Sequence, residues 1–207
     1  AFDYPELASD ALPAARAYAK IAPSAPHALH MPSHIFTRLG LWQESIASNL
    51  DSARAGRELM AKRHPGAEHY DSVHAYDYLE YAYLQIGDGD HARGILTTTA
   101  AIRSVDQRNF AVAYALAAIP ARWALERRDW KGASALGPPA EEPAFPYVPA
   151  LTNFAQALGA ARSGSPDNAR GSLKELERLH AVVVKTPIPG PYDWAGNGID
   201  KTGGSEG

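Results

Sequence analysis

The stretch GLWQES, residues 40–45, recurs in outline at three further places in the chain. The related stretches are GDGDHA at 87–92, RDWKGA at 128–133 and GSPDNA at 164–169. In each, Gly or a polar residue is followed two positions later by Trp, Gly or Pro, and a small residue then opens a new apolar-periodic segment. Gly tolerates the positive φ with which many helices end, and a small residue lets the next helix pack closely. We therefore predict that each stretch is the tight corner between two antiparallel helices.

Segments of helical periodicity flank these corners, whereas β-branched runs and Asn-Gly hairpin turns are nearly absent. The fold class that follows is all-α. The expected helices are residues 5–21, 26–39, 42–57, 67–87, 89–104, 108–128, 130–136, 148–163 and 166–184. A Pro-rich linker at 137–143 precedes the last pair.

The composition excludes several classes of protein. Hydrophobic residues make up 45% of the chain and charged residues 21%, which is typical of a folded domain. The net charge is −3 and no basic patch stands out, so we expect no nucleic-acid partner. No apolar run approaches the roughly 18 residues that a bilayer requires, so we expect no membrane span. The chain has no Cys, so any metal ion would have to be held by His, Asp or Glu.

The corner stretches, and the Pro that closes some second helices such as 5–21, resemble the tetratricopeptide-repeat (TPR) family with elongated, degenerate repeats. Residues 27–49, HALHMPSHIFTRLGLWQESIASN, are similar to a stretch in a group of long bacterial TPR proteins of mostly unassigned function. The resemblance implies a right-handed superhelix of stacked antiparallel helix pairs, a TPR-like α-solenoid, over residues 1–185. It also implies an interaction module that binds a peptide or protein partner on its concave face.

Both ends of the chain look incomplete, as in a fragment of a longer array. The opening AFDY, residues 1–4, echoes AYDY at 75–78, which lies inside an expected helix. At the other end, residues 186–207 are rich in Pro and Gly and lack apolar periodicity, so we expect a poorly ordered tail. A repeat array without end caps exposes apolar helix faces, so self-association through those faces is a further expectation.

Three of the eight histidines lie close together in PHALHMPSHIF, residues 26–36. His27, His30 and His34 are spaced i, i+3, i+7, which places them on one face of a helix. Pro32 falls inside this helix and should kink it between His30 and His34. The alternative is that the regular helix begins at Pro32, in which case His27 and His30 lie in the preceding loop.

A second cluster of polar residues lies on the expected helix 67–87. Asp71, His74, Tyr78 and Tyr81 are spaced for one face of that helix, and His69 lies at its start. In TPR-type stacks the first helices of successive pairs line the concave surface. The candidate groove therefore combines both clusters, and its residues are His27, His30, His34, His69, Asp71, His74, Tyr78 and Tyr81.

Three interpretations of this groove stay open. The histidines and tyrosines could be structural, satisfying buried polar groups across neighbouring helices. They could instead contact a peptide or protein partner, which the fold resemblance favours. The third interpretation is a site for zinc or another divalent metal, in a metal-binding protein or metal-dependent hydrolase. Its candidate ligands are His27, His30, His34 and His74, with His69 or Asp71 as further choices for a third ligand. No residue is assigned a catalytic role, and a non-enzymatic function is favoured.

Overall fold

The computed structural model describes residues 2–137, 145 and 148–185 of the chain. Within these residues the regular structure is helical, and the β-type pairing is a single isolated bridge between Glu68 and Val105. The all-α prediction is confirmed. The helices are α1 (Ala8–Tyr18), α2 (Pro26–His30), α3 (Pro32–Arg38), α4 (Trp42–Arg63), α5 (Tyr70–Gln85), α6 (Gly89–Ala100), α7 (Phe110–Glu126), α8 (Trp130–Ser134), α9 (Val148–Arg162) and α10 (Pro166–Lys185).

The four predicted corners are confirmed as the turns between consecutive helices. Gly40, Gly87 and Gly164 have φ values of 68°, 75° and 82°, and Arg128 takes the same left-handed conformation with φ 54°. At the first corner the Leu41 N–H donates to the Phe36 carbonyl at 2.8 Å, and equivalent bonds close the other three corners. This bond satisfies a carbonyl that the end of the helix would otherwise leave without a partner.

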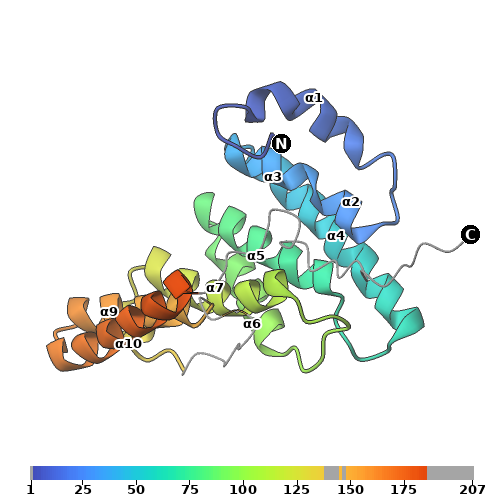
Figure 1. Cartoon of the computed structure of the whole chain (residues 1–207). Coiled ribbons are helices and arrows are strands. Elements are labelled where there is room, and N and C mark those ends of the chain that lie inside the picture. The colour runs from blue at the N-terminus through green and yellow to red at the C-terminus, as the bar shows by residue number, and fades with distance from the viewer. Residues whose placement is uncertain (1, 138–144, 146–147, 186–207) are drawn as a thin grey trace, which may run out of the picture.

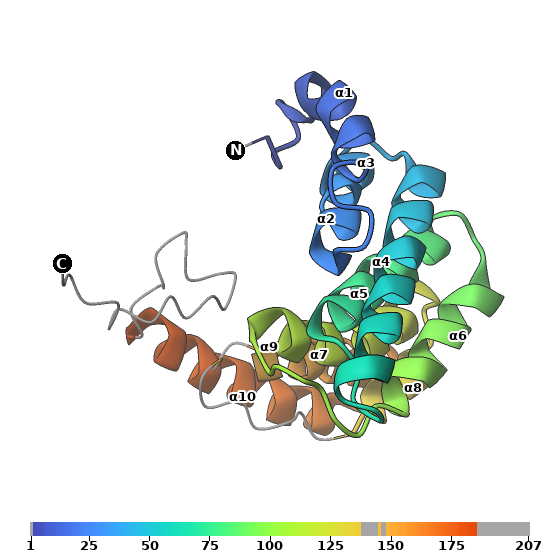
Figure 2. The ribbon, with the colours of Figure 1, turned by 90° about the vertical axis from the view of Figure 1, so that its right-hand side faces the viewer.

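The helices pack as antiparallel pairs whose first members also contact one another. Helix α5 packs against α4, α6 and α7, and α7 packs in turn against α9. In Figure 1 the chain runs from α1 through α5 and α7 at the centre to the α9–α10 pair at the opposite end. Figure 2 shows a curved path with α4, α6 and α8 along its outer side. The elements facing the inner side are therefore the first helices of the pairs.

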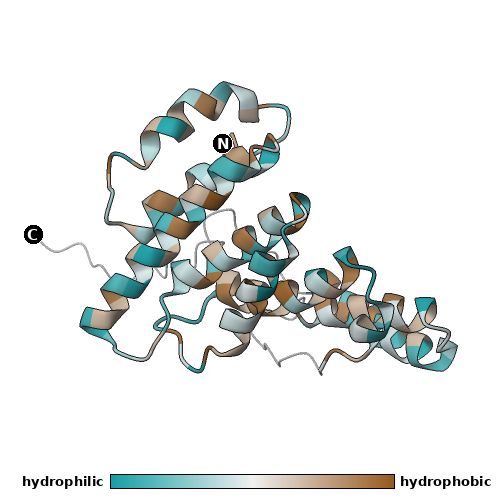
Figure 3. Ribbon diagram, turned by 180° about the vertical axis from the view of Figure 1, so that it is seen from behind, coloured by the Kyte–Doolittle hydropathy of each residue, from teal (hydrophilic) through white to brown (hydrophobic). Residues whose placement is uncertain are grey.

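The main hydrophobic core lies between α4, α5, α6 and α7. Leu79 and Ile119 are fully buried at its centre, and fully buried alanines such as Ala75 and Ala115 let these helices approach closely. In Figure 3 hydrophobic residues gather in the central helices, and hydrophilic residues recur along the length of α4. The core therefore holds α5 and α7 side by side, and one side of each helix is turned toward the inner side.

Several predicted boundaries need correction. The expected helix 26–39 is two helices that meet at Met31, because Pro32 interrupts the backbone hydrogen bonding as predicted. The alternative in which His27 and His30 lie in a loop is wrong, since both belong to α2. Helix α4 continues to Arg63, six residues beyond its expected end.

Two further expectations concern the chain's ends and its relation to membranes. The predicted tail at 186–207 and most of the linker at 137–143 lie outside the described residues. Within the part of the chain that the structure describes, no helix combines the length and apolarity needed to cross a bilayer.

Candidate functional site

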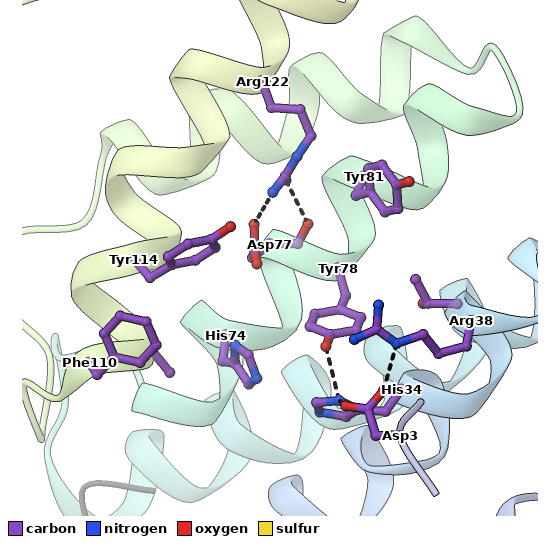
Figure 4. Close-up of a pocket in the computed structure, with 12 residues that line it drawn as sticks. Asp3, His34, Arg38, His74, Asp77, Tyr78, Tyr81, Phe110, Tyr114 and Arg122 are labelled. Atoms are coloured by element: carbon purple, nitrogen blue, oxygen red, sulfur yellow. Dashed lines mark hydrogen bonds and ion pairs between the residues drawn. The ribbon is translucent and has the colours of Figure 1, made fainter. Parts of the chain in front are cut away.

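A pocket of about 750 Å³ opens on the inner side, among α3, α5 and α7. Figure 4 shows His34 and His74 on one side of it, with Tyr78 next to both and Arg122 on the opposite side. The residues that line it are Asp3, His34, Thr37, Arg38, His74, Asp77, Tyr78, Tyr81, Phe110, Ala111, Tyr114 and Arg122. The pocket thus draws its lining from the first helices of three successive pairs and from the segment before α1.

His30 lies behind the pocket wall and is fully buried. Its Nδ1 is 2.7 Å from Oδ1 of Asn49, whose own amide nitrogen donates to the Ser45 carbonyl at 2.8 Å. This second bond fixes the orientation of the Asn49 amide, so an oxygen faces His30 Nδ1. His30 therefore carries its proton on Nδ1 and leaves a lone pair on Nε2. Burial lowers the pKa of His30 well below its ordinary value, and the nearby His74 adds to that effect.

His34 lies one helical turn after His30, across the break at Met31. Its Nδ1 is 2.8 Å from Oδ2 of Asp3 and 3.0 Å from the Tyr78 hydroxyl. The hydrogen bond to His34 holds the pKa of the Asp3 carboxyl far below its usual range, so Asp3 accepts and His34 Nδ1 donates. The lone pair of a neutral His34 is then also on Nε2, which is 3.0 Å from Nε2 of His30.

His74 on α5 completes a cluster of three imidazoles. Its ring centroid is 4.4 Å from that of His30 and 6.1 Å from that of His34. One ring nitrogen from each of the three histidines lies within 4.8 Å of the other two. The buried Nδ1 of His74 has no hydrogen-bond partner among the described residues. Burial lowers the pKa of His74 to about 4, so its imidazole is neutral at pH 7.

An ion-pair network lies on the other side of the pocket. Arg122 contacts Asp77 Oδ1 at 2.8 Å and Glu80 Oε2 at 2.7 Å, and its guanidinium lies 5.3 Å from the Tyr81 ring centroid. Two carboxyl groups therefore share one guanidinium. Burial raises the pKa of Glu80 to about 7, although the charge of Arg122 opposes that rise.

The structure brings together five of the eight candidate groove residues. His30, His34 and His74 form the imidazole cluster, and Tyr78 and Tyr81 line the pocket beside it. The remaining three lie outside the pocket lining and the imidazole cluster. The side chain of His27 is 58% exposed and bonds Asp71, whereas His69 caps the start of α5 by accepting from the Asp71 N–H.

Sequence reasoning missed four charged residues of the pocket: Asp3, Arg38, Asp77 and Arg122. Asp77 lies on α5 beside Tyr78, but the spacing argument placed it off the polar stripe. One available signal was the echo between residues 1–4 and 75–78, because the Asp of each stretch lines the pocket. Nothing in the local sequence around Arg122 indicates that it turns toward α5.

The chemistry available in the cluster is that of neutral imidazole nitrogens held by neighbouring acceptors. Three such nitrogens suit a zinc, cobalt, nickel or copper ion. Two of the three rings are oriented by an oxygen on the far nitrogen, as in many metal centres. A comparison of the chain with protein-family models, curated proteins and solved structures finds no match.

Proposed function

We propose that this chain is a helical-repeat protein that binds a divalent transition-metal ion through His30, His34 and His74. The observation that carries the proposal is the 3.0 Å separation between Nε2 of His30 and Nε2 of His34. When both rings are neutral and hold their protons on Nδ1, two lone pairs point at each other across this distance. Such an arrangement is repulsive unless a cation lies between them.

The cation is a proton on His34 or a metal ion, and the third ring of the cluster favours the metal ion. A proton on Nε2 of His34 would make that ring an imidazolium beside Asp3, with neutral His30 as its acceptor. A metal ion instead requires neutral imidazoles, which burial favours. The third ring, His74, presents a buried nitrogen that lacks a partner among the described residues, as a ligand would before binding.

The distances fit a metal centre with modest adjustment. Zn–N bonds of about 2.0–2.1 Å in tetrahedral geometry place ligand nitrogens about 3.3 Å apart. The pair His30–His34 is already at 3.0 Å, and the cluster as a whole lies within 4.8 Å. Rotation of the His74 ring would bring its nitrogen into range.

The test is zinc titration of metal-free protein, followed by calorimetry and by elemental analysis after dialysis. We expect about one equivalent of zinc with a dissociation constant below about 1 µM. His74→Gln should weaken binding at least about 100-fold, since it removes one ligand of three. His180→Gln on α10 is the matched control and should bind as the wild type does. Less than about a tenth of an equivalent in wild type, or unchanged binding in His74→Gln, would overturn the proposal.

A second function is recognition of a peptide or protein partner on the inner surface. The observation that favours it is the origin of the pocket lining, which comes from three successive first helices. This arrangement agrees with a TPR-like α-solenoid that winds as a right-handed superhelix, which we propose for the fold as a whole. If a partner binds there, Tyr81→Ala should abolish its binding without changing the circular dichroism spectrum. Partner binding that survives this variant would contradict the assignment.

Self-association through exposed apolar helix faces also stays a prediction. It is supported by exposed apolar side chains on α10, where Leu173 is 51% and Val184 69% exposed. Sedimentation velocity over a range of concentrations tests it, and a monomer throughout would contradict it.

A further inference from the structure

The geometry points to the ligand of this pocket: we infer that it takes a carboxylate with an aromatic or apolar body, whose oxygen binds the metal ion and whose charge contacts Arg38. The inference rests on the proposed metal site. It goes further because it names what occupies the pocket beside the ion.

The direction of the open metal position is the first step. Three imidazoles leave at least one coordination position for an exogenous ligand. His34 and His74 line the pocket, whereas His30 lies behind its wall and is fully buried. The open position therefore faces the pocket, away from His30.

The charge balance of the pocket is the second step. Its lining contains two carboxylates, Asp3 and Asp77, and two guanidinium groups, Arg38 and Arg122. These four charges cancel, and each carboxylate is already paired with a guanidinium. The neighbouring Glu80 lies behind Arg122 and does not line the pocket. A divalent ion would therefore leave the site positive, whether Glu80 is protonated or not, and an anion would restore the balance.

Arg38 is the residue placed to receive that anion. Its Nε donates to Asp3 Oδ1 at 2.8 Å, and Asp3 in turn contacts His34. The Arg38 side chain is 47% exposed, and in Figure 4 its guanidinium extends over the pocket beside Tyr78. The Nε contact leaves the two terminal nitrogens for a second acceptor, and a guanidinium fork matches the geometry of a carboxylate.

Aromatic rings in the pocket indicate the chemistry of the part of the ligand attached to its carboxylate. Phe110 and Tyr114 from α7 form one wall, and their ring centroids are 5.7 Å apart. Tyr78 and Tyr81 from α5 line the same pocket. A volume of about 750 Å³ is far larger than a simple anion such as acetate needs. The site therefore fits an acid that carries an aromatic or aliphatic group, either as a free small molecule or as the C-terminal residue of a peptide.

Cobalt(II) makes the test direct, because its visible spectrum reports changes in coordination. Cobalt-loaded protein would be titrated with 3-phenylpropionate and, separately, with the neutral 3-phenylpropanamide. We expect a saturable spectral change with the acid and none with the amide. Arg38→Met, saturated with cobalt, should bind the acid at least about tenfold more weakly than cobalt-saturated wild type. Arg54→Met, an exposed arginine on α4 paired with Asp51, is the matched control.

Two peptide probes separate the sources of the carboxylate. Gly-Gly-Phe with a free C-terminus and the same tripeptide with an amidated C-terminus would be compared with 3-phenylpropionate. Tighter binding of the free tripeptide assigns the site to peptide C-termini, and equal binding assigns it to small acids; either result supports a carboxylate site. Equal responses to acid and amide, or an Arg38→Met protein that binds the acid as wild type does, overturn the inference. Failure to bind cobalt at all would instead overturn the metal site itself.

Discussion

Glu80 is the most informative single position for testing the electrostatics of this fold. Its side chain is fully buried, and its Oε2 lies 2.7 Å from Arg122 Nη1. Arg122 also contacts Asp77, so one positive charge serves two carboxyl groups. Glu80→Gln keeps the shape and the acceptor toward Arg122 but removes the titration. Asp77 then remains as the single partner of opposite charge, so no unpaired charge is left in the interior.

The expected change in the free energy of unfolding with pH follows from the raised pKa of Glu80. That pKa is about 7 in the folded chain, against an ordinary value of 4.5. Between these values the folded state keeps a proton that the unfolded state releases. The stability contributed by this protonation is fully present below pH 4.5 and is lost as the pH rises through 7. Each pH unit in this window lowers the free energy of unfolding by about 1.4 kcal/mol. Between pH 5 and pH 8 the wild type therefore loses about 2.5 kcal/mol of stability.

The assay is urea unfolding of wild type and Glu80→Gln at pH 5, 6, 7 and 8, followed by circular dichroism. The quantity to compare is the free energy of unfolding of the variant minus that of the wild type. We expect this difference to grow by about 2.5 kcal/mol from pH 5 to pH 8, in favour of the variant. Glu126→Gln, an exposed position on α7, should show little change over the same range. A flat difference for Glu80→Gln, or one that grows toward acid, would refute the reasoning.

Two backbone positions offer further predictions. A Cβ at Gly159 would lie 2.5 Å from Ser134 N on α8, so Gly159→Ala should lower the free energy of unfolding by about 2 kcal/mol. Gly171→Ala, where a Cβ meets nothing within 4 Å, should raise the free energy of unfolding by up to about 1 kcal/mol. Thermal melts in which Gly159→Ala is the more stable of the two variants would contradict the packing. Arg128→Gly relieves a left-handed φ of 54° and should stabilise by about 1 kcal/mol, whereas Arg127→Gly should not; a destabilised Arg128→Gly would count against the corner geometry.

The predicted elements that proved correct depend on short-range chemistry. Three of the four corners follow from a Gly that accepts a positive φ and ends a helix within a few positions, and Arg128 takes the same conformation at the other. The break before Pro32 follows from a missing N–H and a ring that excludes the regular helix. The stripe of His74, Tyr78 and Tyr81 on α5 follows from helical periodicity. In each case the cause lies within one or two helical turns of its effect.

Short-range sequence patterns predicted only some of the residues of the site. His30, His34 and His74 were among the candidates, but so were His27 and His69, which have the same chemistry and similar spacing. Depth separates His30 from His27, since His30 is enclosed by Asn49 and α5 while His27 is exposed. His69 is buried too, but its ring lies at the start of α5, where it accepts from the Asp71 N–H. Burial depends on which residues of other helices cover a side chain.

The sequence by itself determined that this chain is helical, where its corners lie and which helix is broken. Each of these features is the response of the local backbone to its own side chains. The tertiary structure alone decided that Asp3 reaches His34 across 31 residues and that Arg122 reaches Glu80 across 42. Those contacts depend on the packing of α3, α5 and α7, and packing sums many weak apolar contacts between residues distant in the chain. No local pattern in the sequence predicts which distant residues meet. The charged residues of the pocket could therefore be identified only from the tertiary structure.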